Sequence, residues 1–205
     1  MNMNGLEFVF SDPDLFLSVL VVSTFKIAYN VLVYLSASRH PAEILYTKWL
    51  KVASIINLIL IGFFILIPRI MGWMGIIINL LLIPPFIFTY GLTFLYYGKE
   101  NQDMFKKYLK RTGIYFTISY LLALFFVFDP LMKGLATMNL FITILYWSIG
   151  LTIIALKVLA YCFMIKHANL HEDSYLKFSA ILSIVLIALS FVLNPLIITN
   201  IYAFI

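Results

Sequence analysis

Long uncharged apolar runs alternate with short polar segments along the whole chain. As an α-helix, each run would cover roughly 25–30 Å, which is the thickness of the hydrocarbon core of a bilayer. The pattern therefore predicts an all-α, polytopic integral membrane protein, with a single transmembrane domain over residues 1–205. We expect six transmembrane helices, at about residues 15–35, 51–68, 71–97, 112–129, 138–165 and 178–195.

Three of these runs share a pattern, because each follows an aromatic-Leu-Lys step and ends near a proline. The copies extend from Trp49-Leu50-Lys51 to Pro68, from Tyr108-Leu109-Lys110 to Pro130, and from Tyr175-Leu176-Lys177 to Pro195. An aromatic residue beside a lysine is typical of the point where a helix leaves water for lipid. The copies favour a chain of three helical hairpins. Any membrane helix can carry such ends, however, so the repeat is a hypothesis.

The composition agrees with a membrane protein and excludes a soluble one. Of the 205 residues, 63% are hydrophobic and only 11% are charged, whereas about a quarter of the residues in soluble domains are charged. The single cysteine, Cys162, excludes an internal disulfide. The first residues carry Glu7, Asp12 and Asp14 and no basic region, so we expect no signal peptide here.

Basic residues are divided unevenly between the two sides of the predicted topology. One side carries Arg39, Lys48, Lys51, Lys99, Lys106, Lys107, Lys110, Arg111, Lys166 and Lys177. The other side carries Arg69 and Lys133. Because cytoplasmic loops are enriched in Lys and Arg, we expect a multi-pass protein of the cell membrane whose three longer loops are cytoplasmic. Both termini are then extracytoplasmic.

The basic cytoplasmic face is a candidate interaction surface. We assign to it Arg39, Lys48, Lys51, Lys106, Lys107, Lys110, Arg111 and Lys177. Contact with anionic lipid headgroups explains such a face. The alternatives are docking of a cytoplasmic partner, such as an ATPase, and guidance of a polyanion such as nucleic acid.

Lys26 is the main candidate inside the membrane, because it lies near the middle of the first predicted span. A lysine there costs roughly 2.5–3.5 kcal/mol. Lys157 lies in the fifth span and can extend toward the cytoplasmic side. The predicted spans contain no acid except Asp129, at the end of the fourth. We expect Lys26 either to be neutral or hydrated, bonded to carbonyls or to Asn57 and Asn79, or to contact an anionic substrate or another subunit's acid.

Pro84 and Pro85 interrupt the third span, because two consecutive prolines remove two backbone donors. A break at membrane depth is tolerated only against protein or a cavity, so we expect either a packed kink or an unwound segment beside a path. The candidate residues of such a path, or of subunit pairing, are Lys26, Asn30, Asn57, Asn79, Pro84, Pro85 and Lys157.

Catalysis and metal binding have little support in the sequence. His167 and His171 are weak candidates for a metal site, because they share a helix face if the fifth helix continues, but they fall in a predicted polar loop. The chain shows no glycine-rich phosphate loop, no nucleophile with its base and no paired carboxylates inside a span. We therefore expect no enzymatic activity and no cofactor.

Two functions remain. The first is membrane transport or translocation, with the chain forming a pore or path in a multi-protein system. The sequence does not identify the solute, and an anion or a polyanion such as nucleic acid is one candidate. The second is a non-catalytic anchor or assembly subunit of a larger membrane complex, such as a respiratory or secretion complex, in which Lys26 and Lys157 pair with acids of other subunits.

Overall fold

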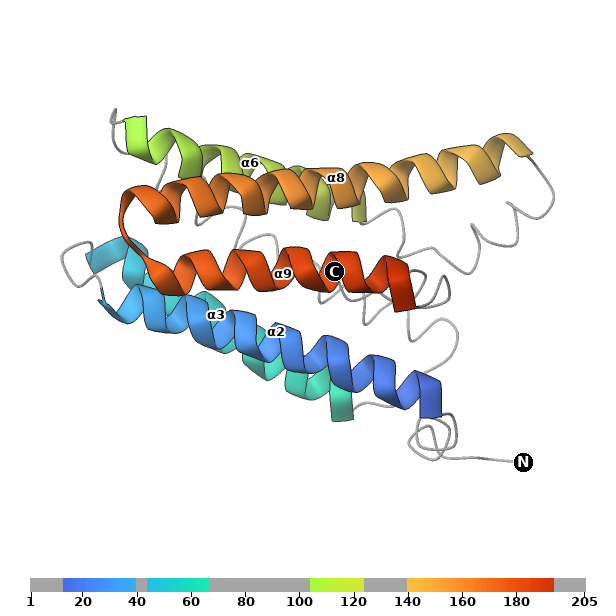
Figure 1. Cartoon of the computed structure of the whole chain (residues 1–205), viewed down its shortest axis with the longest axis horizontal. Helices are drawn as coiled ribbons and strands as arrows, with labels where there is room; N and C mark the ends of the chain where they lie inside the picture. The colour runs from blue at the N-terminus through green and yellow to red at the C-terminus, as the bar shows by residue number, and fades with distance from the viewer. Residues whose placement is uncertain (1–12, 40–43, 67–103, 124–139, 194–205) are drawn as a thin grey trace.

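A computed structural model describes residues 13–39, 44–66, 104–123 and 140–193 (Figure 1). These residues form five α-helices and contain no strand, and a described turn at residues 171–173 joins the last two helices. The helices are α2 (Pro13–Arg39), α3 (Ile44–Leu66), α6 (Met104–Ala123), α8 (Leu140–Leu170) and α9 (Ser174–Leu193). The all-α prediction is confirmed for this part of the chain.

One of the described helices, the 31-residue α8, is long and apolar enough to cross a membrane. Shorter apolar stretches occur in α3, at Leu50–Ile59, and in α9, at Ser174–Leu189. Membrane association therefore has support from α8, and the arrangement of six spans stays a prediction. The third predicted span, with Asn79, Pro84 and Pro85, lies outside the described residues.

Several helices extend further into the polar segments than the apolar runs indicated. The first continues to Arg39, the second begins at Ile44, and the fourth begins at Met104. The fifth continues to Leu170, so that His167 is helical and the prediction of a loop at this position is wrong. The physical reason is that an apolar run marks the part of a helix that suits lipid, whereas Lys, Arg and Glu are good helix formers and continue the helix beyond it.

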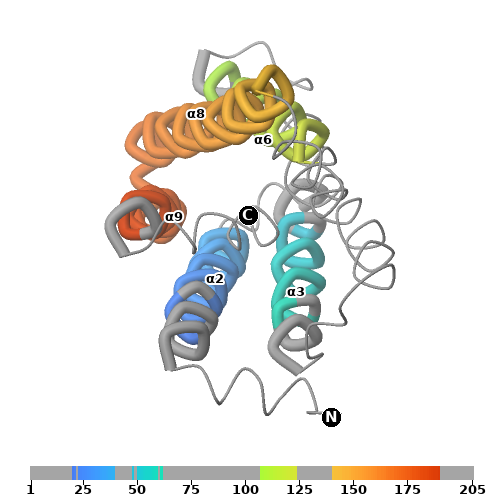
Figure 2. Tube along the Cα trace, turned by 90° about the vertical axis from the view of Figure 1, so that its right-hand side faces the viewer, coloured from blue at the N-terminus to red at the C-terminus, as the bar shows by residue number. Residues whose placement is uncertain are grey.

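The helices are arranged in a curved row. In Figure 1, α2 and α8 run in one direction, and α3, α6 and α9 run in the other. Each helix packs on the next in the order α3, α2, α9, α8, α6, and Figure 2 shows this row curving around a common interior. As a result, the C-terminal ends of α2 and α8 lie at the same end of the bundle as the N-terminal ends of α3, α6 and α9.

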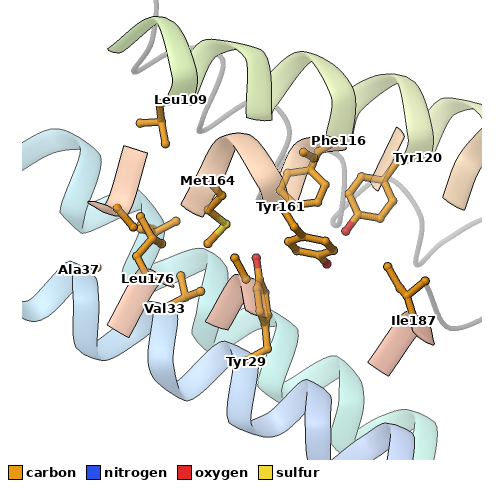
Figure 3. Packing of buried hydrophobic residues seen from close by; sticks show 14 residues of the cluster. Tyr29, Val33, Ala37, Leu109, Phe116, Tyr120, Tyr161, Met164, Leu176 and Ile187 are labelled. Carbon is orange, nitrogen blue, oxygen red and sulfur yellow. The ribbon is translucent and has the colours of Figure 1, made fainter. Parts of the chain in front are cut away.

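Buried side chains from all five helices form a common core (Figure 3). Its members are Tyr29, Val33, Ala37, Leu50, Leu109, Phe116, Tyr120, Ala160, Tyr161, Met164, Ala168, Leu176, Ala180 and Ile187. Small residues such as Ala160 and Ala180 allow helix backbones to approach closely. Where α6 meets α8, the single hydroxyl proton of Thr112 is shared between the Tyr108 carbonyl of its own helix, at 3.0 Å, and the Ala160 carbonyl of α8, at 3.3 Å. This bond joins two helices whose own backbone bonds are already complete.

Candidate functional site

Lys157 is enclosed in the bundle, with 1% of its surface exposed. Its Nζ lies 4.8 Å from the centre of the Tyr120 ring on α6. This is the geometry of a cation–π contact, which attracts an ammonium to the negative face of an aromatic ring. The expectation that Lys157 extends toward the cytoplasmic side is therefore wrong, because the side chain turns into the core against Tyr120.

Aromatic rings surround this position and connect three helices. Tyr29 of α2 meets Tyr161 of α8 edge to face at 6.1 Å between ring centres, and Phe116 of α6 meets Tyr161 in the same way at 5.1 Å. Phe116 also stacks on Tyr120 at 6.1 Å. Aromatic pairs in these geometries add about 0.5–1.5 kcal/mol each beyond burial, so the cluster holds α2, α6 and α8 in a fixed register.

The contact between Tyr29 and Tyr161 brings Lys26 to the level of Lys157. The two helices run in the same direction (Figure 1), and each lysine precedes its tyrosine by one helical turn. Residues one turn apart share a helix face. Lys26, which is partly buried, therefore starts from about the same depth as Lys157. The structure thus places two lysines that are far apart in the sequence at one level of the bundle.

The two predicted asparagines in the described residues are also buried. Asn30 is 3% exposed, and its Nδ2 donates a hydrogen bond to the Lys26 carbonyl over 2.8 Å. Asn57 is fully buried on α3. Three buried serines, Ser54, Ser119 and Ser179, likewise donate to carbonyls of their own helices.

The tyrosines were missed by sequence reasoning, which treated them as part of the apolar runs. A signal was nevertheless present. Tyr29 and Tyr120 lie well inside predicted spans, and Tyr161 lies one turn before the end of the fifth, whereas tyrosines that anchor a helix at the membrane surface lie at its ends. A tyrosine in mid-span needs a partner for its hydroxyl, and two of these three are one turn from a lysine.

The predicted basic face is gathered at one end of the bundle. Arg39, Lys48, Lys107, Lys110 and Arg111 are exposed there, and Lys51 and Lys177 are partly buried. The side chain of Lys106 lies outside the described residues.

An aromatic stack lies among these basic residues at the junction of α6 and α8. Tyr108 and Tyr115 both stack on Phe163, with ring centres 6.1 and 5.6 Å away. The guanidinium of Arg111 and the ammonium of Lys166 lie 5.3 and 5.6 Å from the centre of the same ring. Two exposed cations are therefore held beside one aromatic surface.

A second group at this end ties α2 to α9. The Ser36 hydroxyl donates a hydrogen bond to Oδ2 of Asp173 over 2.5 Å. The Arg39 guanidinium donates to the Tyr175 hydroxyl over 2.9 Å and lies 4.2 Å from the centre of its ring. Asp173 also accepts a bond from the Leu176 backbone N–H through Oδ1, at 3.0 Å. One carboxylate thus caps α9 and holds α2 against it.

The histidine pair lies next to this connection. His167 is buried inside α8, and its ring centre is 4.5 Å from that of His171. Within the described parts of the chain, no group of three or more His, Cys, Asp or Glu side chains is placed to hold a metal ion. The pair by itself supplies two ligands, and structural zinc needs four.

Comparison with known proteins adds no relationship to these observations. No protein-family model, no curated protein and no solved structure matches the chain.

Proposed function

We propose that the protein crosses the membrane with six helices arranged as three hairpins, and that the interior of the bundle is a path for a solute. The path is lined by Lys26, Lys157, Asn30 and Asn57, and the proposal includes Asn79, Pro84 and Pro85 on the third span.

The packing order of the described helices supports the three hairpins. Consecutive helices α2 and α3 pack together, as do α8 and α9. Between hairpins, the first helix of one packs on the second helix of another, because α2 contacts α9 and α8 contacts α6. The same rule therefore applies at both of the described junctions, as expected if the hairpins are related by rotation about an axis through the bundle.

The membrane reading rests chiefly on α8, where a lysine is buried and large apolar side chains are exposed. Lys157 is enclosed, whereas large apolar residues of the same helix are exposed. They include Leu140, Phe141, Ile144, Leu151 and Leu159, with 76%, 71%, 57%, 56% and 44% of their surface accessible. Water-soluble bundles have the reverse distribution. The exposure of these apolar side chains together with the burial of Lys157 is the observation that carries the proposal.

The orientation follows from the charged end. Lys and Arg are enriched on the cytoplasmic side of membrane proteins, so the end with Arg39, Lys107, Lys110 and Arg111 faces the cytoplasm. Both termini are then extracytoplasmic. Anionic lipid headgroups on that side provide counter-charges for the exposed cations beside Phe163.

Transport is tested by reconstitution. The purified chain is placed in liposomes, and entry of radiolabelled chloride, inorganic phosphate, acetate and rubidium is compared with entry into protein-free liposomes. We expect at least one solute to enter faster with protein present. Equal entry for every solute would contradict a path formed by this chain on its own.

The second candidate function is a non-catalytic subunit of a larger complex. The exposed cations Arg111 and Lys166, held beside an aromatic stack, are suited to docking an acidic cytoplasmic partner. Gentle solubilisation from the native membrane distinguishes the two functions. A partner recovered in stoichiometric amount supports the subunit, and a clean homo-oligomer supports an autonomous path.

A further inference from the structure

We infer that the junction of α6 and α8 at the basic end binds one anionic phospholipid. Arg111 and Lys166 bind its phosphate, and its acyl chain follows the two helices toward the middle of the bundle. The site rests on the membrane-spanning arrangement proposed above and goes beyond it, because it names the molecule that covers this surface and the residues that select it.

Two cations from different helices meet at one aromatic ring. Arg111 of α6 and Lys166 of α8 are both exposed, and their charged groups lie 5.3 and 5.6 Å from the centre of the Phe163 ring. The two charges are therefore no further apart than these distances added together. A cation–π contact attracts a cation to a ring that has no net charge. Both positive charges consequently remain available to an anion.

The ring at the centre of this arrangement is itself held in place. Tyr108 and Tyr115, two turns apart on α6, both stack on Phe163 of α8. Such contacts restrict the orientation of the ring and therefore the position at which the two cations gather. Tyrosine, with an apolar body and a polar tip, is enriched where a membrane meets water. The stack thus suits the level of the lipid headgroups.

The charge around the ring has one sign. α6 begins with Lys106, Lys107, Lys110 and Arg111, and neither α6 nor α8 contains an acidic residue. Lys107 and Lys110 are exposed beside Arg111. Clustered like charges raise the local concentration of counter-ions, and the cytoplasmic leaflet supplies anionic lipids. The surface is therefore complementary to a negatively charged headgroup.

Exposed apolar side chains continue from the two cations toward the middle of the bundle. Ile118 follows Arg111 by seven residues on α6, and Leu159 precedes Lys166 by seven residues on α8. Residues seven apart share a helix face and lie about 10 Å apart along the axis. Because α6 begins and α8 ends at the basic end (Figure 1), both apolar side chains lie on the deeper side of the cations. They are 42% and 44% exposed.

This order of parts matches a phospholipid. Its anionic headgroup meets the cations, and its acyl chain meets the apolar side chains below them. An acidic protein docked from the cytoplasm accounts for the cations but does not reach side chains at the depth of the hydrocarbon. The apolar continuation therefore favours a lipid over a protein partner.

The experiment measures lipid binding to the purified chain in detergent by native mass spectrometry. Phosphatidylglycerol is titrated against phosphatidylcholine with the same acyl chains. Arg111→Gln and Lys166→Gln each remove one charge, Arg111→Lys and Lys166→Arg keep it, and Lys48→Gln removes an exposed lysine of α3 as the control. We expect selective binding of one phosphatidylglycerol. Each Gln variant at the site should weaken it about fivefold, whereas the charge-conserving variants and Lys48→Gln should bind as the unaltered chain does.

Several results would overturn the site. Equal weakening by Lys48→Gln would indicate diffuse attraction to positive charge, and equal binding of phosphatidylcholine would exclude recognition of the headgroup charge. Displacement of the lipid by an equal concentration of glycerol phosphate would identify a free phosphate compound as the ligand. A protein partner lost from Arg111→Gln and Lys166→Gln, with phosphatidylglycerol binding unchanged, would assign the surface to that partner.

Failure of the site can be told apart from failure of the proposed function. Membranes that contain the chain are first washed with alkaline carbonate, which releases proteins that do not span the bilayer. Release would overturn both the membrane-spanning arrangement and the lipid site. Retention without selective binding of phosphatidylglycerol would overturn the site alone. Selective binding in a chain that moves no solute in liposomes would support the site and reject the path.

Discussion

Glu172 occupies an unusual backbone conformation for a residue that is not glycine, with φ at 53°. It follows the end of α8 at Leu170, and the backbone N–H of Asp173 donates to the Ala168 carbonyl over 2.9 Å across it. This pattern is a Schellman motif, in which the position of Glu172 is usually glycine. A side chain with a Cβ costs roughly 1–2 kcal/mol in this region of φ, so the turn between α8 and α9 is formed against a local penalty.

Replacing this residue should make the protein more stable. We expect Glu172→Gly to raise the free energy of unfolding by about 1 kcal/mol, because glycine adopts positive φ without the steric cost. Glu172→Ala is the control, since it removes the carboxylate but keeps the Cβ. The measurement is the midpoint of thermal unfolding in detergent. An equal gain in both variants would show that the charge, and not φ, is responsible.

The pair of helices α2 and α9 depends on one carboxylate near their shared end. Asp173 caps α9 through Leu176 and accepts the Ser36 hydroxyl from α2. This carboxylate is buried, so water would not replace a donor that a mutation removes. Each of the two hydrogen bonds therefore contributes more to stability than it would at an exposed carboxylate. The contact joins the first hairpin to the third, and it was not foreseen because Ser36 and Asp173 both lie in segments that the apolar pattern assigns to loops.

Removal of the carboxylate should weaken this junction more than removal of the hydroxyl. We expect Asp173→Ala to cost about 2–4 kcal/mol, as the sum of a lost cap and a lost charged hydrogen bond. Asp173→Asn should cost less, because asparagine caps helices well. With Ser36→Ala and the double variant, a cycle of unfolding measurements isolates the bond between the helices. Additive losses would contradict the coupling of Ser36 to Asp173.

The contact of α6 with α8 includes a hydrogen bond from Thr112 to the Ala160 carbonyl. We expect Thr112→Val to destabilise the protein by about 0.5–1.5 kcal/mol, since valine keeps the shape and loses the donor. Thr117→Val is the matched control, because the Thr117 hydroxyl donates to the Gly113 carbonyl of its own helix. Thermal unfolding of the two variants side by side tests this, and equal losses would argue against a role for the contact between helices.

On the scale of the whole molecule, the basic side chains fall into two groups, one at an end of the bundle and one in its interior. The described ends that carry Arg39, Lys107, Lys110, Arg111 and Lys177 lie together (Figure 1), and the lysines of the interior form a separate level, marked by the rings of Figure 3. The basic end carries exposed cations, whereas Lys157 in the interior is enclosed. Because the two groups of lysines are separated along the bundle, we expect substitutions in one group to leave the packing of the other intact.

The orientation in the membrane is testable by labelling of single cysteines. Cys162→Ser provides a background without cysteine, and His171→Cys and Leu140→Cys then mark exposed positions at opposite ends of α8. We expect a membrane-impermeant maleimide to label Leu140→Cys on intact cells and His171→Cys only after permeabilisation. Labelling of His171→Cys on intact cells would invert the proposed topology.

Hydropathy by itself determined the helical class and the approximate positions of the five described helices. It also singled out Lys26 and Lys157 as charged residues within apolar runs. This was possible because a bilayer demands long apolar helices and makes a buried charge conspicuous. It misplaced the helix ends, because a helix continues through Lys, Arg and His wherever its backbone bonds are satisfied.

Tertiary structure decided what the pattern leaves open. The packing order of the helices, the Tyr29–Tyr161 contact that aligns Lys26 with Lys157, and the bond from Ser36 to Asp173 all join residues that are distant in the chain. Periodicity along one helix indicates which face is polar, but it carries no information about which other helix that face meets. The physical reason is that the choice of neighbour depends on side-chain fit and hydrogen bonding between helices, and these exist only once the helices have packed.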